Sequence, residues 1–154
     1  MMRFLRSTSG TSLVEFAIVA PVLLFLVVGL IEVGRYEYFA ILTAHAARAG
    51  AQYGAQDLET AYDNADITSA VLQDGGNPAN WTGAGGSITI NQLCASSGSA
   101  PGICTTPWGS SPPQNTIYYV QVQVTGTFTS LLNFPGIPNN IPISSSAMQR
   151  VENQ

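Results

Sequence analysis

One acidic side chain, Glu15, lies at the edge of a long apolar run, and its position calls for a charge partner. Residues 16–31 are all apolar, glycine or proline, and extending back to position 13 gives nineteen residues in which Glu15 is the only charge. A charged side chain in a membrane helix costs about 3 kcal/mol at the helix centre, so it needs a partner or a place near the interface. Cleavage after Gly10 would supply a partner, because Thr11 would then carry an ammonium group one helical turn from Glu15.

The apolar run is long enough to cross a membrane. At about 1.5 Å per helical residue, residues 13–31 span roughly 28 Å, close to the ~30 Å hydrocarbon core of a bilayer. Arg3 and Arg6 precede the run, and the next basic residue is Arg35, between Glu32 and Glu37. By the positive-inside rule, we expect a cytoplasmic N-terminus and an exported C-terminal part.

A cleaved secretory signal is the competing interpretation of a basic start followed by an apolar segment. The only plausible small-x-small triplet for such a signal is at residues 44–46, thirteen residues past Ile31 and behind three charged residues. We therefore expect the apolar helix to be retained.

The pattern around Glu15 also resembles a known processing site. Gly10, four further residues and then Glu15-Phe16 resemble the cleavage site of prepilins in tight-adherence (Tad/Flp) pilus systems. Residues 15–24 and 29–35 are similar to the opening of TadE-like pseudopilins, and residues 46–55 resemble the small-residue helix of that family. The chain departs from the family pattern at Ala49 and Gln52, where charges are common, so no role of those charges is carried over.

The resemblance is close over residues 10–55 and looser at 144–150, and it implies a function. It implies a minor pilin or pseudopilin for the assembly or initiation of a tight-adherence (Flp-type IV) pilus, which serves adhesion and surface colonisation. The implied partners are a prepilin peptidase that cuts between Gly10 and Thr11, other pilins or pseudopilins, the pilus assembly machinery and membrane lipid. Glu15 and Phe16 are the implied assembly and recognition residues.

The implied location is the bacterial inner membrane. The protein would be single-pass, with a cytoplasmic N-terminus and a periplasmic C-terminal domain, and incorporation into the extracellular pilus is one fate open to it. Major pilins of these systems are little more than a helix. Removing ten residues from the 154 leaves 144, a length that favours a minor component.

Two other classes of protein remain open. A pseudopilin of a type II secretion machine has a similar helix and glutamate, but it usually places phenylalanine directly after the cleaved glycine, where this chain has Thr11. The second class is an unprocessed, membrane-anchored module that binds an envelope partner through its exported domain.

The patterns predict an α+β, pilin-like fold in which a long transmembrane and amphipathic helix packs on a small antiparallel sheet. The expected parts are a leader at 1–10, a transmembrane helix segment at 11–31, its continuation at 32–56, and an exported domain with a disulfide loop at 57–154. We expect helix from about residue 12 to 55 with a bend near Pro21, because proline removes a helical hydrogen bond. A second helix is expected at about 58–73 with Asp57 as its N-cap.

Small residues recur every four positions along the first helix, at Ala46, Gly50 and Gly54. Such a row lets another backbone approach closely. It suits either packing between subunits in a helical assembly or packing of the helix on its own domain, and the sequence favours neither.

Alternating polar and apolar residues predict half-buried strands at about 87–93 and 116–128, with a last strand at 141–151. Residues 95–115 are expected to form an irregular surface loop. Cys94 and Cys104 lie close together at the start of this loop, and in an exported domain such a pair indicates a disulfide. The alternative is two reduced thiols, which would require the opposite topology.

Composition excludes several kinds of chemistry. The chain has no lysine and a formal charge of −4; loss of Arg3 and Arg6 would leave three arginines against nine acidic residues, or −6. Nucleic acid is therefore not an expected partner, since phosphate binding needs basic side chains. His45, the single histidine, has no cysteine or carboxylate at metal-ligand spacing, and no serine has a recognisable base. We expect no metal site, no cofactor and no enzymatic activity.

Overall fold

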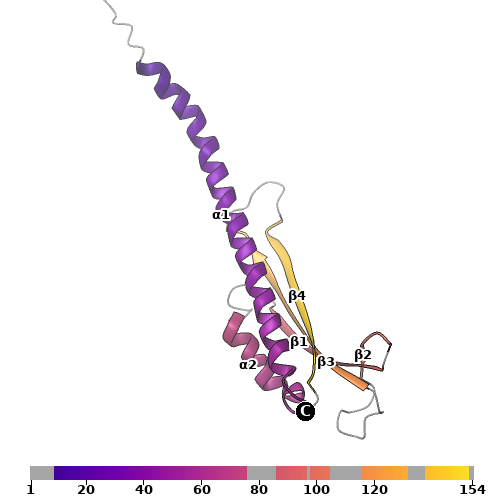
Figure 1. Ribbon diagram of the computed structural model, residues 1–154. Helices are drawn as coiled ribbons and strands as arrows, with labels where there is room; N and C mark the ends of the chain where they lie inside the picture. Colours follow the sequence, from indigo (N-terminus) through magenta and orange to yellow (C-terminus); the bar gives the residue numbers. More distant parts are fainter. Residues whose placement is uncertain (1–8, 76–85, 97, 105–115, 132–137, 153–154) are drawn as a thin grey trace, which may run out of the picture. The chain divides into compact units, whose positions relative to one another are not determined.

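The computed structural model describes residues 9–75, 86–96, 98–104, 116–131 and 138–152. The chain divides into two compact units, Met1–Tyr36 and Glu37–Gln154, and each is described by itself. The fold is α+β, as predicted: one long N-terminal helix and a small antiparallel sheet of four strands (Figure 1).

The first unit consists of the N-terminal part of helix α1, which runs over Ser9–Gly54. The helix begins three residues earlier than the sequence predicted and continues without interruption through Pro21. Proline is tolerated inside membrane helices when neighbouring groups satisfy the freed carbonyl. Residues 1–8 of the predicted leader lie outside the described residues.

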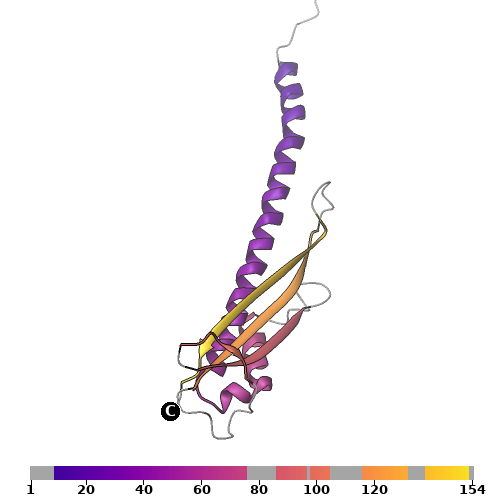
Figure 2. The ribbon, with the colours of Figure 1, turned by 90° about the vertical axis from the view of Figure 1, so that its right-hand side faces the viewer.

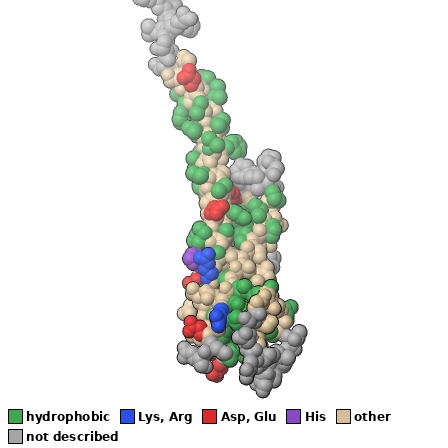
Figure 3. All heavy atoms as spheres, turned by 45° about the vertical axis from the view of Figure 1, so that its right-hand side comes forward, with side chains coloured by type: hydrophobic (Ala, Val, Ile, Leu, Met, Phe, Trp, Pro, Cys, Tyr) green, Lys and Arg blue, Asp and Glu red, His purple; other side chains and the backbone are tan. Residues whose placement is uncertain are grey.

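The large apolar side chains of this unit are exposed. They include Leu13, Phe16, Ile18, Leu23, Leu24, Phe25, Leu26 and Leu30. Figure 3 shows hydrophobic side chains covering the N-terminal part of α1. By length and composition, the helix is able to cross a membrane. Glu32 and Arg35, three residues apart, form an ion pair just after the apolar run.

The second unit contains the rest of α1, a 3₁₀ turn η1 at Thr60–Tyr62, and helix α2 at Asn64–Gly75. The single helix predicted at 58–73 is thus wrong in its start. Asp57 accepts a hydrogen bond from the Thr60 amide (2.8 Å) and stabilises only the short turn. The N-cap of α2 is Asp63, whose carboxylate accepts from the amides of Ala65 and Asp66, both at 3.0 Å.

The sheet contains strands β1 (Ser87–Ser96), β2 (Gly102–Ile103), β3 (Thr116–Thr129) and β4 (Asn140–Arg150). The order is β2-β1-β3-β4, and all neighbouring strands are antiparallel. Figure 2 shows β1, β3 and β4 side by side. The three long strands were predicted, whereas β2 lies inside the stretch expected to be irregular. Residues 105–115 of that stretch lie outside the described residues.

One face of the sheet forms the core of the second unit. Val120, Val122 and Val124 alternate along β3 and are completely buried. They belong to one cluster with Ile67 and Val71 of α2 and with small residues of α1. Pairing with β1 and β4 extends this apolar face through Ile88, Ile90 and Ala147.

The opposite face of the sheet carries mostly polar side chains. Cross-strand hydrogen bonds link Ser87 to Thr125 (2.7 Å) and the Gln123 amide to the Ser144 hydroxyl (3.2 Å). This alternation is typical of an antiparallel sheet with one covered and one polar face.

Candidate membrane and assembly site

The predicted processing and recognition residues lie together on the first turns of α1. Gly10, Thr11, Glu15 and Phe16 are all helical and exposed, and the Phe16 residue is 69% accessible. A Cβ added at Gly10 would meet nothing within 4 Å. A side chain at Gly10 would therefore meet no other group. The predicted cleavage site lies within α1, whereas the sequence placed it before the start of the helix.

Glu15 is a lone charge in apolar surroundings. Its neighbours Leu13, Val14 and Ile18 are exposed apolar side chains. No residue in the described part of the chain forms an ion pair or hydrogen bond with its carboxylate. Thr11 precedes Glu15 by four residues, the spacing that brings two side chains together on one face of a helix. A positive charge at Thr11 would therefore lie on the same face of the helix as the Glu15 carboxylate and neutralise it.

The small-residue row predicted for helix packing is buried inside the second unit. Ala46, Gly50 and Gly54 are all buried. A Cβ at Gly54 would lie 2.8 Å from Ile67 Cδ1 and 3.1 Å from Val120 Cγ1. Both contacts are within the chain, so the row packs α1 on its own domain. These three residues leave little surface for a neighbouring subunit.

Gly75 is a close-packing residue that the sequence did not single out. A Cβ at this position would overlap Ala46 Cβ, which places the end of α2 directly on α1. Gly75 lies just past the second helix expected at 58–73, so no packing role was predicted for it. The signal in the sequence was a glycine just past the end of the expected helix, where a small residue suits close approach of two backbones.

The structure pairs Cys94 with Cys104 in a disulfide, with the Cα atoms 5.3 Å apart. Cys94 is on β1 opposite Gly102 of β2, and Cys104 directly follows β2. The bridge thus closes the base of the short β1–β2 hairpin. Cys94 and Cys104 both pack against the hydrophobic core, which connects the hairpin to the rest of the unit.

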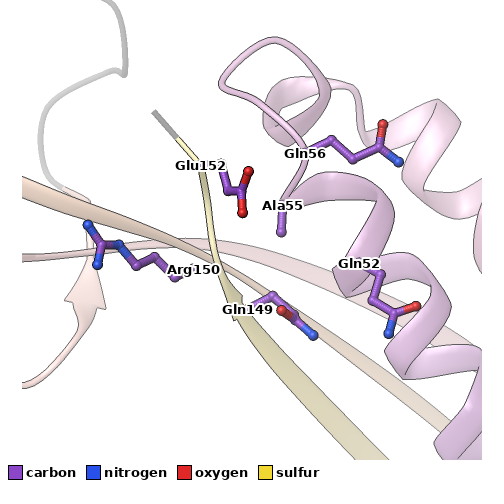
Figure 4. A pocket seen from close by; sticks show the side chains of 6 residues that line it. All are labelled: Gln52, Ala55, Gln56, Gln149, Arg150 and Glu152. Carbon is purple, nitrogen blue, oxygen red and sulfur yellow. The ribbon is translucent and has the colours of Figure 1, made fainter. Parts of the chain in front are cut away.

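An open polar pocket lies between the end of α1 and the end of β4 (Figure 4). Its cavity volume is about 290 Å³, just below the usual range of small-molecule sites. The lining residues are Gln52, Ala55, Gln56, Gln149, Arg150 and Glu152. The Glu152 amide donates to the Ala55 carbonyl at 3.1 Å, which fixes the C-terminal segment beside α1. Its lining residues include no serine, cysteine or threonine that could act as a nucleophile beside a base.

Metal chemistry has no support in the part of the chain that the structure describes. Those residues contain no group of three or more histidine, cysteine, aspartate or glutamate side chains able to hold a metal ion. His45 is exposed on α1.

Comparison with known proteins decides which family this part of the chain resembles. Residues 10–52 match the TadE-like protein family. The match begins at the predicted cleavage glycine and confirms the resemblance to TadE-like proteins over this segment. No curated protein and no solved structure gives a significant match.

The TadE-like match indicates a protein associated with the Tad pilus, and α1 supplies a helix for membrane anchoring in that system. It also indicates interaction with other pilus components. The matched residues include Gly10, Glu15 and Gly50, while the sheet and the disulfide lie outside the match.

Proposed function

We propose that the protein is a minor pilin or pseudopilin that takes part in assembling or initiating a tight-adherence pilus. It is anchored by α1 in the bacterial inner membrane with its N-terminus in the cytoplasm and its second unit in the periplasm. The TadE-like match over residues 10–52 supports the pilus association. The disulfide supports an oxidising compartment for the second unit.

A prepilin peptidase cuts between Gly10 and Thr11 in this proposal. The new ammonium group of Thr11 then pairs with Glu15, on the same chain or on an adjacent subunit. The observation that carries this step is Glu15 itself, an exposed carboxylate among exposed apolar side chains with no ion-pair partner among the described residues. Mutual neutralisation removes much of the cost of placing two charges at the membrane edge.

The uncleaved membrane anchor and the type II secretion pseudopilin are the competing functions. N-terminal sequencing of the protein extracted from membranes separates cleaved from uncleaved forms. A start at Thr11 supports processing, and a start at Met1 would remove the pilin proposal. Co-purification with Tad components, rather than with a type II secretion machine, separates the two kinds of pseudopilin.

A pair of matched substitutions tests the role of Glu15. Glu15→Gln keeps the shape of the side chain and removes its charge, so we expect normal insertion and cleavage but loss of co-purification with other pilus subunits. Glu37→Gln is the control, because Glu37 is also an exposed acid on α1 but lies beyond the apolar run. Equal co-purification of the Glu15→Gln variant and the unaltered protein would show that the pairing is not needed.

A further inference from the structure

Strand β4 is an edge of the sheet. It pairs with β3 on one side, and no other described strand pairs with its second side (Figure 2). Two hydrogen bonds at its ends show which backbone groups face β3. The Val151 amide donates to the Tyr118 carbonyl at 2.9 Å, beyond one end of the ladder. The Ser130 amide donates to the Asn139 carbonyl at 3.0 Å, beyond the other end, and both pairs continue the β3–β4 register.

Every second residue of β4 therefore directs its backbone groups away from the sheet. Bonded and non-bonded pairs alternate along an antiparallel ladder, so the odd-numbered residues of β4 form the bonds to β3. The N–H and C=O groups of Ser144, Ser146 and Met148 face outward, and all three residues are exposed. Pro142 occupies the preceding outward position, where its missing N–H removes no ladder bond. No backbone hydrogen bond from another described segment reaches the three outward residues.

The usual protection of an edge strand is missing from this part of β4. Free edges are commonly blocked by charged residues, especially lysine, or by proline. Residues 143–149 contain neither, and Arg150 is the first charged residue of the strand. Ser145 and Ala147 lie on the core face and are only half-buried, so the core is incompletely covered at this edge. An apolar side chain on an added strand would cover them.

The polar pocket adjoins the end of this row. Its lining residues come from two segments, 52–56 and 149–152. Figure 4 shows Gln52 of α1 and Gln149 of β4 among them. Glutamine amides donate and accept hydrogen bonds, as the two groups of a peptide backbone require. A strand that pairs with Met148 and continues along the edge therefore reaches a site able to hold its end.

We propose that the free edge of β4 is the docking site for an extended, uncharged segment of another pilus subunit, which joins the sheet as a further strand. The occupant is a polypeptide strand, because outward N–H and C=O groups at every second residue match the backbone of a neighbouring strand. It is uncharged, because a charge beside residues 143–149 would find no partner on β4. The TadE-like match indicates interaction with other pilus components. The proposal rests on the pilus association in the proposed function and adds the surface that this interaction uses.

Amide hydrogen exchange, followed residue by residue by NMR spectroscopy, tests the edge directly. The full chain is purified in detergent and measured alone and with each purified pilin or pseudopilin of the same pilus system. Alone, we expect fast exchange at Ser144, Ser146 and Met148 and slow exchange at Ser145 and Ala147, which bond to β3. With a subunit that docks, exchange at the three outward amides should slow by about tenfold or more.

Two substitutions at one position separate the backbone contact from the side chain. Ser146→Pro removes an outward N–H but no bond to β3, and Pro142 shows that an outward position of this strand accepts proline. Loss of one intermolecular backbone hydrogen bond should weaken binding of the docked subunit about tenfold. Ser146→Ala is the matched control, because it removes the side chain and keeps the N–H. Thermal unfolding should show that both variants fold.

Protection of the outward amides, together with weakened binding in Ser146→Pro but not in Ser146→Ala, supports the docking site. A subunit that binds without protecting these amides would overturn it and leave the pilus association intact. Slow exchange at all five amides in the monomer would overturn it too, because the edge would already be covered. Protection that grows with the concentration of the protein alone would assign the edge to a second copy and overturn the choice of partner. If no subunit binds, the docking site falls together with the pilus association.

Discussion

Gly50 of α1 packs so closely on Val71 of α2 that a Cβ at position 50 would overlap Val71 Cγ2. Two methyl groups of Val122 lie at 3.3 and 3.4 Å from the same point, so the glycine is enclosed by a helix and a strand. Valine has a restricted χ1 angle and cannot easily turn away. Close approach of α1 to the core of the second unit therefore depends on the absence of a side chain at position 50.

The substitution Gly50→Ala should lower the stability of the second unit. Overpacking a core costs about 1–3 kcal/mol. Alanine recovers up to about 1 kcal/mol through its higher helix propensity, so a net loss of about 1 kcal/mol is expected. Thermal unfolding followed by circular dichroism in detergent measures the change. Gly34→Ala is the control, since a Cβ there meets nothing within 4 Å, and an equal effect of both substitutions would contradict the packing role.

Loss of the disulfide should also destabilise the second unit. The bridge joins residues ten positions apart, and in the chain-entropy model such a loop contributes about 2.5–3 kcal/mol. We expect the double variant Cys94→Ser, Cys104→Ser to unfold at a lower temperature than the oxidised protein. Reductant should lower the unfolding temperature of the unaltered protein and leave that of the variant unchanged. An unchanged melting curve of the variant would show that the bridge contributes nothing.

The sequence predicted the long elements because their patterns are strong. The apolar run of α1 is too long for a strand and long enough for a membrane helix. The alternation around Val120 and Val122 has the period of two that is typical of a strand. The strand β2 was missed because two residues carry no period, and its pairing depends on the neighbouring strand. The start of α2 was misplaced because both Asp57 and Asp63 are suitable N-caps, and only the packing of Ile67 and Val71 selects the second.

The candidate site could be predicted only in part. Gly10 and Glu15 were identified because a local motif marks them. The role of Gly50 stayed open between two kinds of packing, because its partners Val71 and Val122 are 21 and 72 positions away in the chain. The contact between the rings of Phe39 and Phe128 was likewise not predicted, since it depends on the direction in which β3 crosses α1.

Processing should be abolished by a bulkier residue at the cleavage site. Gly10→Leu places a side chain where the structure has open space, so we expect no change in the folding of the second unit. A peptidase that accepts only glycine before the cut would leave the leader attached. Mass spectrometry of the membrane-extracted protein should then show the full-length chain. Gly29→Leu is the control, because that glycine is equally open, and a variant of Gly10 with normal mature size would contradict the assigned site.

Asp57 should make the stability of the second unit depend on pH in the acidic range. The Thr60 amide, which donates a hydrogen bond to the Asp57 carboxylate, lowers the pKa of Asp57 below its ordinary value. A carboxylate with a lowered pKa stabilises the folded state above the pKa it has in the unfolded chain. This contribution is lost as the pH falls below about 4 and through the folded-state pKa. Unfolding by denaturant at several pH values should therefore show a smaller acid-induced loss in Asp57→Asn than in the unaltered protein. Glu59→Gln removes a neighbouring acid whose side chain takes no part in this turn, and it should retain the full pH dependence. Identical pH profiles for all three proteins would mean that the Asp57–Thr60 contact does not contribute to folding.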